Sequence, residues 1–94
     1  MNIHFFMNKA IEVAKKGVLA NEIPIGAVLV NNQNNEIISI AHNKINQLSN
    51  STKHAEMVVI EDSCLKLKSK FLSNTTIFVT LEPCAMCAAA NITI

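Results

Sequence analysis

The chain has 94 residues, of which 50% are hydrophobic and 16% charged, with a formal net charge of +1. This length predicts a single small domain over residues 1–94, and the apolar content excludes a disordered chain. The weak net charge and the absence of arginine disfavour a strong electrostatic field for nucleic acid, and no apolar run is long enough to span a bilayer.

The first half of the chain predicts a helix followed by a hairpin. Apolar residues recur at helical spacing from about residue 2 to about residue 20, and Pro24 ends that helix. The apolar run 25–30 predicts a strand buried on both faces. The asparagine-rich stretch 31–35 predicts a turn, and residues 36–41 predict the returning antiparallel strand. The polar stretch 42–52 has no periodicity and predicts a loop.

A second helix is predicted from about residue 54 to about residue 66, with Ser51 or Thr52 as its N-cap. Its apolar face is expected to contain Val58, Val59 and Leu65.

The C-terminal third predicts a strand and one more helix. Residues 75–81 are rich in β-branched side chains, which favour a strand. A third helix is expected to begin near Pro83 and to continue through Ala90. The predicted order is therefore α-β-β-α-β-α.

Two short strings carry candidate metal ligands: His54-Ala55-Glu56 and the C-x-x-C pair Cys84 and Cys87. One imidazole and two thiolates suit zinc, and three protein ligands leave the fourth position open, as in catalytic sites. Both strings fall at predicted helix starts, where the helix dipole favours thiolate over thiol. Glu56 is then the candidate acid/base beside the metal.

Other interpretations of these residues are less specific. Glu56 alone could be a solvated helix residue, and a lone C-x-x-C could be a redox pair or half of a zinc ribbon. A ribbon needs a second cysteine pair, and the one further cysteine, Cys64, is expected to be a small core residue. The odd cysteine count argues against a secreted disulfide framework and favours the cytoplasm.

The chain resembles the cytidine/deoxycytidylate deaminase superfamily, most closely its bacterial tRNA adenosine deaminases. The resemblance runs from about residue 7 to about residue 90. It rests on residues 22–30 (EIPIGAVLV), Asn43, residues 52–56 (TKHAE) and residues 80–87 (TLEPCAMC). The pairing of H-x-E with P-C-x-x-C is the signature of zinc nucleobase deaminases.

The resemblance implies a three-layer α/β/α sandwich with zinc on His54, Cys84 and Cys87 and with Glu56 as proton shuttle. It implies substrate contacts from Asn43, Ile25 and Ala55. Members of the superfamily normally continue for several dozen residues beyond the cysteine helix. We therefore expect a truncated domain that lacks the usual C-terminal strands and helices, with strand 76–81 as an exposed edge.

The implied function is zinc-dependent hydrolytic deamination of a nucleobase, with adenosine to inosine in tRNA as the favoured reaction. One alternative is a free-base or nucleotide deaminase acting on cytosine, guanine or deoxycytidylate. Another is an inactive, truncated zinc-binding remnant. The expected partners are the nucleobase, tRNA and a second copy of the chain, in the cytoplasm and without a membrane.

Overall fold

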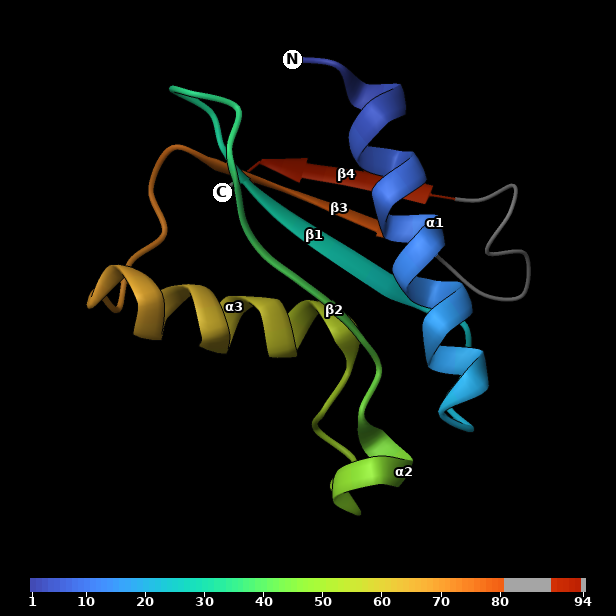
Figure 1. Ribbon diagram of the computed structural model, residues 1–94. Coiled ribbons are helices and arrows are strands. Elements are labelled where there is room, and N and C mark those ends of the chain that lie inside the picture. The colour runs from blue at the N-terminus through green and yellow to red at the C-terminus, as the bar shows by residue number, and fades with distance from the viewer. Residues whose placement is uncertain (81–88, 94) are drawn as a thin grey trace.

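A sheet separates two helices in the computed structural model, which describes residues 1–80 and the backbone of 89–93 (Figure 1). The sheet has the order β2-β1-β3-β4, and neighbouring strands are antiparallel. Its strands are β1 (Gly26–Asn31), β2 (Ile37–His42), β3 (Thr75–Thr80) and β4 (Ala89–Thr93). The helix α1 (Ile3–Leu19) covers one face and α3 (Ala55–Leu67) the other, which confirms the predicted α/β/α layers.

The alternation of side chains along β1 builds a separate core on each face of the sheet. Val28 and Val30 pack with Phe6 of α1 and Phe78 of β3, and the two rings stack with centroids 5.3 Å apart. The intervening β1 residues face α3. That second core consists of Ala27, Leu29, Ala41, Ala55, Val59, Leu72, Ile77 and Val79. The prediction of a first strand buried on both faces is therefore confirmed.

The stretch 42–52 was predicted to be a loop, and this is wrong in two places. His42 closes β2, and the short helix α2 (Ile45–Leu48) interrupts the rest. No apolar periodicity marks a helix of one turn, so only its tertiary contacts stabilise it.

The predicted second helix is present as α3, but its N-cap is His54 and neither Ser51 nor Thr52. The Thr52 N–H and hydroxyl both donate to Asn50 Oδ1, at 3.0 and 2.7 Å, so this side chain is used within the preceding turn. The buried face of α3 also differs from the prediction.

The buried face of α3 follows an i, i+4 row of small residues, namely Ala55, Val59 and Ser63. Val58 is only partly buried and Leu65 is 77% exposed. Small side chains let the helix approach the sheet closely, which the hydrophobicity pattern alone does not show.

The predicted third helix is wrong where the structure describes it. Pro83 lies outside the described residues, but Ala89 and Ala90 belong to β4 and pair with Thr80 and Val79. Strand pairing overrides the helix propensity of alanine here. β3 lies between β1 and β4, so the prediction that it forms an exposed edge is also wrong. No helix in the described parts of the chain is long and apolar enough to cross a membrane.

Gly26 marks the closest approach of the sheet to α1. A Cβ at this position would overlap the carbonyl oxygen of Ala10 and lie 2.5 Å from Val13 Cγ1 and 2.8 Å from Ala14 N. Because two of these atoms belong to the helix backbone, Gly26→Ala is expected to lower the free energy of unfolding by about 2–3 kcal/mol. Urea denaturation measures the effect, and an unchanged midpoint would contradict the close approach.

Candidate functional site

Residues far apart in the sequence meet at one end of the sheet. Gly26, which opens β1, is paired with His42, which ends β2. On its other side the Gly26 N–H donates to Thr80 Oγ1 at 2.9 Å, at the end of β3. The sequence-predicted residues Ile25 and Asn43 lie next to Gly26 and His42 in the chain, so they come to the same place.

Asn43 joins this end of the sheet to the first turn of α3. Its side chain is 1% exposed, and its Oδ1 accepts a hydrogen bond of 2.7 Å from the Ala55 N–H. Its own N–H donates to the Ile25 carbonyl at 3.2 Å. The structure therefore brings together Asn43, Ile25 and Ala55, the three predicted substrate contacts. The sequence predicted Ser51 or Thr52 as the side chain that caps α3. The Ala55 N–H at the start of this helix instead donates to an asparagine twelve residues earlier in the chain.

The hydrogen bond to Ala55 fixes the orientation of the Asn43 amide. Only the oxygen can accept from an N–H group, so the NH₂ group must point the other way. Within the described residues no hydrogen bond occupies this NH₂ group. Asn43 therefore presents an oriented donor at the end of the sheet.

His54 and Glu56 flank Ala55 at the start of α3. His54 is exposed, and its side chain makes no hydrogen bond within the part of the chain that the structure describes. Its carbonyl accepts the Val58 N–H at 2.9 Å, which begins the helix. Glu56 is partly buried in the first turn, beside the positive end of the helix dipole.

The predicted ligands Cys84 and Cys87 lie outside the described residues. The residues that flank this stretch, Thr80 and Ala89, are paired across β3 and β4 at the end of the sheet described above. Among residues 1–80 and 89–93, no group of three or more His, Cys, Asp or Glu could hold a metal. His54 supplies an imidazole at this end of the sheet, and Cys84 and Cys87 supply two thiols in the sequence between Thr80 and Ala89; the chemistry of this donor set fits zinc.

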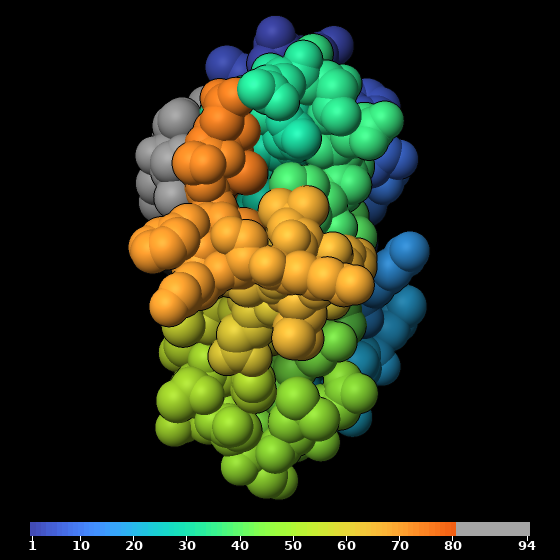
Figure 2. All heavy atoms as spheres, turned by 90° about the vertical axis from the view of Figure 1, so that its left-hand side faces the viewer, coloured from blue at the N-terminus to red at the C-terminus, as the bar shows by residue number. Residues whose placement is uncertain are grey.

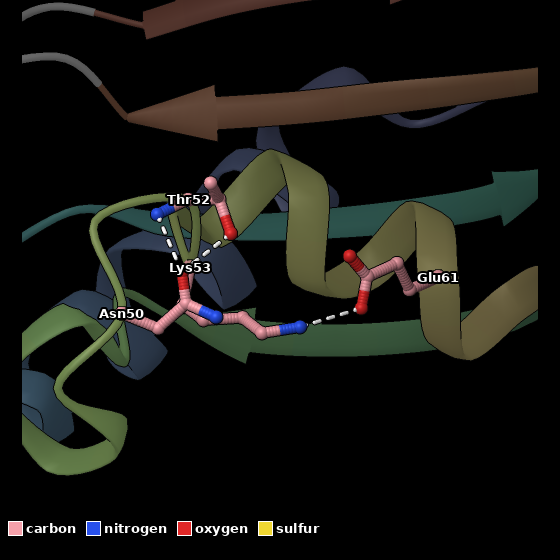
Figure 3. A network of polar contacts seen from close by, with 4 residues as sticks. All are labelled: Asn50, Thr52, Lys53 and Glu61. Atoms are coloured by element: carbon pink, nitrogen blue, oxygen red, sulfur yellow. Dashed lines mark hydrogen bonds and ion pairs between the residues drawn. The ribbon is translucent and has the colours of Figure 1, made fainter.

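Polar contacts order the chain that leads into His54, as Figure 3 shows. Asn50 Oδ1 accepts both hydrogen bonds from Thr52, and the Lys53 ammonium lies 2.8 Å from Glu61 Oε2 on α3. The Lys53 carbonyl also accepts the Lys44 N–H at 2.9 Å. The hydrogen bond between Lys44 and Lys53 therefore holds the two ends of the segment between Asn43 and His54 together.

A hydrogen bond of Asp62 connects α3 to the edge strand β2. Ser39 Oγ donates to Asp62 Oδ2 at 2.6 Å, and the Lys66 ammonium lies 3.1 Å from the same oxygen. The Ser39 hydroxyl and then Lys66 lower the pKa of Asp62 below its ordinary value of 3.8.

Because the pKa of Asp62 is depressed on folding, its stabilising contribution is present above 3.8 and is lost as the pH falls through the lower folded value. Ser39→Ala is expected to cost about 1 kcal/mol near pH 6 and less near pH 2. Urea denaturation at the two pH values measures this. An equal cost at both would show that the hydrogen bond does not depend on the carboxylate.

Comparison with known proteins places the whole chain in one family. The family model for the cytidine and deoxycytidylate deaminase zinc-binding region matches residues 1–94. The chain is 41% identical over 90 residues to the tRNA-specific adenosine deaminase of Aquifex aeolicus (strain VF5), covering 96% of this chain and 58% of that protein. It is 49% identical over 85 residues to the enzyme of the same name from Bacillus subtilis (strain 168), covering 90% and 52%. The chain thus spans about half the length of these curated relatives.

Solved structures agree on the fold. A chain from a study of A-to-I editing by tRNA:A34 deaminases superposes with a TM-score of 0.79 at 38% identity, covering 89% of this chain and 63% of that one. Guanine deaminase from Bacillus subtilis superposes with a TM-score of 0.81 at 33% identity, covering 93% and 55%. The predicted zinc cofactor is confirmed for the family, while the assignment of its ligands stays a prediction. The chain belongs to the cytidine and deoxycytidylate deaminase zinc-binding family.

Proposed function

We propose that His54, Cys84 and Cys87 bind zinc and that the chain catalyses hydrolytic deamination of a nucleobase. The observation that carries this proposal is the hydrogen bond from Ala55 to Asn43. It holds an oriented amide donor beside the helix start that presents His54 and Glu56. A base-binding donor, a candidate metal ligand and a carboxylate thus share one end of the sheet.

The reaction replaces the ring amine by a carbonyl, consuming water and releasing ammonia. Zinc, when bound, supplies Lewis acidity that makes water a nucleophile near neutral pH. Glu56 accepts one proton from the attacking water and delivers it to the ring nitrogen; it then takes the second proton from the newly attached hydroxyl group and delivers it to the leaving amine, which departs as ammonia. The Asn43 NH₂ group donates to an acceptor atom of the base, and Ile25 contacts its apolar face.

Adenosine in tRNA is the proposed substrate, and inosine the product. The named relatives, tRNA-specific adenosine deaminases at 41% and 49% identity, support this choice. Guanine is the second candidate, because the Bacillus subtilis guanine deaminase structure superposes with a TM-score of 0.81. Further parts of the proposal are a single, partial deaminase domain over residues 1–94, a homodimer and a cytoplasmic location.

The test incubates the folded, zinc-loaded chain with tRNA and, separately, with guanine, cytosine and deoxycytidylate. Inosine in the tRNA supports the primary proposal, and ammonia from one of the small substrates alone supports the alternative. A folded, zinc-loaded sample that deaminates none of them would contradict the proposal and favour a non-catalytic zinc-binding protein.

Two substitutions at Asn43 separate its structural and binding roles. Asn43→Asp keeps an acceptor for the Ala55 N–H but removes the NH₂ donor. Because the start of α3 offsets part of the cost of burying the charge, we expect a smaller loss of stability than in Asn43→Ala and about a tenfold rise in KM. Asn43→Ala removes both and leaves a buried N–H unpaired, at a cost of about 1–3 kcal/mol of unfolding free energy. Thermal melts and steady-state kinetics measure the pair. Equal KM values for Asn43→Asp and wild type would exclude the amide as a base contact.

A further inference from the structure

Glu22 is a buried carboxylate to which the proposed chemistry assigns no role. It lies between α1 and β1 and is 6% exposed. Its Oε1 accepts the Asn46 N–H at 3.0 Å, and its Oε2 accepts the Gln47 N–H at 2.7 Å. A buried carboxylate with both oxygens committed to backbone donors makes strong, charge-assisted hydrogen bonds.

These two donors belong to the first turn of α2. The residue in the N-cap position of α2 is Lys44, whose side chain makes no capping hydrogen bond. Glu22 supplies the missing acceptors from a different part of the chain. A second contact strengthens the attachment, since the Asn46 side-chain amide donates to the Asn21 carbonyl at 2.7 Å.

Glu22 is itself held firmly. Its N–H donates to the Gly17 carbonyl at 2.9 Å, which fixes it to the last turn of α1. Three residues later, the Ile25 carbonyl accepts the Asn43 N–H. The segment 22–25 therefore contacts the loop 43–54 at two places, once through a side chain and once through the backbone.

The loop 43–54 connects the two halves of the proposed site, because it begins at Asn43 and ends at His54. Figure 2 views the molecule from the α3 side and shows this loop, in yellow-green, forming one end of the molecule. Its middle is attached to the rest of the protein through Glu22, and its ends meet through the Lys44–Lys53 and Asn43–Ala55 hydrogen bonds. The helix α2 therefore lies between Asn43 and His54, in a segment that Glu22 attaches to the rest of the protein.

We propose that Glu22 is a positioning residue whose carboxylate, by holding α2, keeps Asn43 against the first turn of α3 in the geometry that binds the base. This inference rests on the proposed function. Glu22 does not touch the base; it acts through Asn43. Its loss weakens the Asn43–Ala55 hydrogen bond and raises KM, while the zinc content stays the same.

The test compares Glu22→Gln with wild type, using Glu36→Gln as the matched control because Glu36 is exposed beside the hairpin turn. Glutamine keeps the length but offers one acceptor to two N–H donors. We expect faster amide hydrogen exchange at Asn46 and Gln47 and also, by at least about tenfold, at Ala55. We expect KM to rise by about tenfold or more with a smaller change in kcat. The control is expected to change neither.

The inference is overturned if exchange quickens at Asn46 and Gln47 while the Ala55 exchange rate and KM remain those of wild type. Glu22 would then be only a local cap for α2. If wild type deaminates nothing, the proposed function fails by itself, and exchange at Ala55 still decides this inference. If Glu22→Gln does not fold, Glu22→Asp replaces it, because it keeps the charge but shortens the side chain by one methylene; faster exchange at Ala55 is then the supporting result and unchanged exchange the contradicting one.

Discussion

Replacing Glu56 by glutamine is expected to slow deamination by about 10²–10⁴-fold while leaving the fold and the zinc content unchanged. Glutamine keeps the size of the side chain but cannot accept and return a proton. Glu56 stands in the first turn of α3, two residues after His54, and is partly buried. Single-turnover formation of inosine or ammonia measures the chemical step, and metal analysis checks the zinc.

The matched control is Glu12→Gln on α1. Glu12 is exposed and pairs with Lys9, so its replacement removes one carboxylate and one surface ion pair without touching the proposed site. We expect its rate to stay close to that of wild type. Glu56→Gln with wild-type activity would contradict the assignment of the proton shuttle. A variant that loses zinc would instead make Glu56 a ligand.

Removing the proposed zinc ligands is expected to lower the stability of the zinc-loaded chain substantially. Cys84→Ala with Cys87→Ala should abolish zinc binding, and with it the stabilisation that bound metal contributes. That stabilisation is about 2.7 kcal/mol when free zinc exceeds its dissociation constant a hundredfold. Thermal melts with and without zinc measure the difference, and the double variant should melt at the same temperature in both.

Cys64→Ala is the control for this experiment. Cys64 is a free, partly buried cysteine that packs against the α3-side core. Its replacement should leave the zinc content at the wild-type value and cost only a little packing. Loss of zinc in Cys64→Ala, or zinc retained by the double variant, would show that the ligands are wrongly assigned.

Local patterns predicted the elements whose burial follows from their own sequence. The helical spacing of apolar residues in α1, the continuous apolar run of β1 and the β-branched stretch of β3 each indicate how that element is buried. The hairpin followed from the asparagine-rich turn, where Asn35 adopts a φ of 59°. In these cases the side chains along the segment carry the information themselves.

The errors arose where a distant residue decides the local structure. The partner of the first N–H group of α3, that of Ala55, could not be assigned from nearby sequence, because this partner, Asn43, lies twelve residues earlier. The helix α2 likewise depends on Glu22, which precedes it by more than twenty residues. Ala89 and Ala90 have high helix propensity, but pairing with β3 places them in a strand.

The candidate site was predicted in part from residue chemistry and in part from resemblance. Spacing and donor type suggested zinc on His54, Cys84 and Cys87. Only the resemblance pointed to Ile25 and Asn43, since neither an apolar residue nor a loop asparagine suggests chemistry by itself. The fold gives that suggestion a physical basis, because Asn43 joins the β1 end of the sheet to the start of α3.

The central claim is that this end of the sheet builds a catalytic zinc centre from one histidine and two cysteines. X-ray absorption spectroscopy of the zinc-loaded chain tests it most directly, with His54→Ala as the comparison. We predict two sulfur ligands, one imidazole nitrogen and one further light atom at the open position, with the imidazole contribution absent in His54→Ala. A shell of four sulfurs, a shell without sulfur, or an imidazole contribution that survives in His54→Ala would contradict the account.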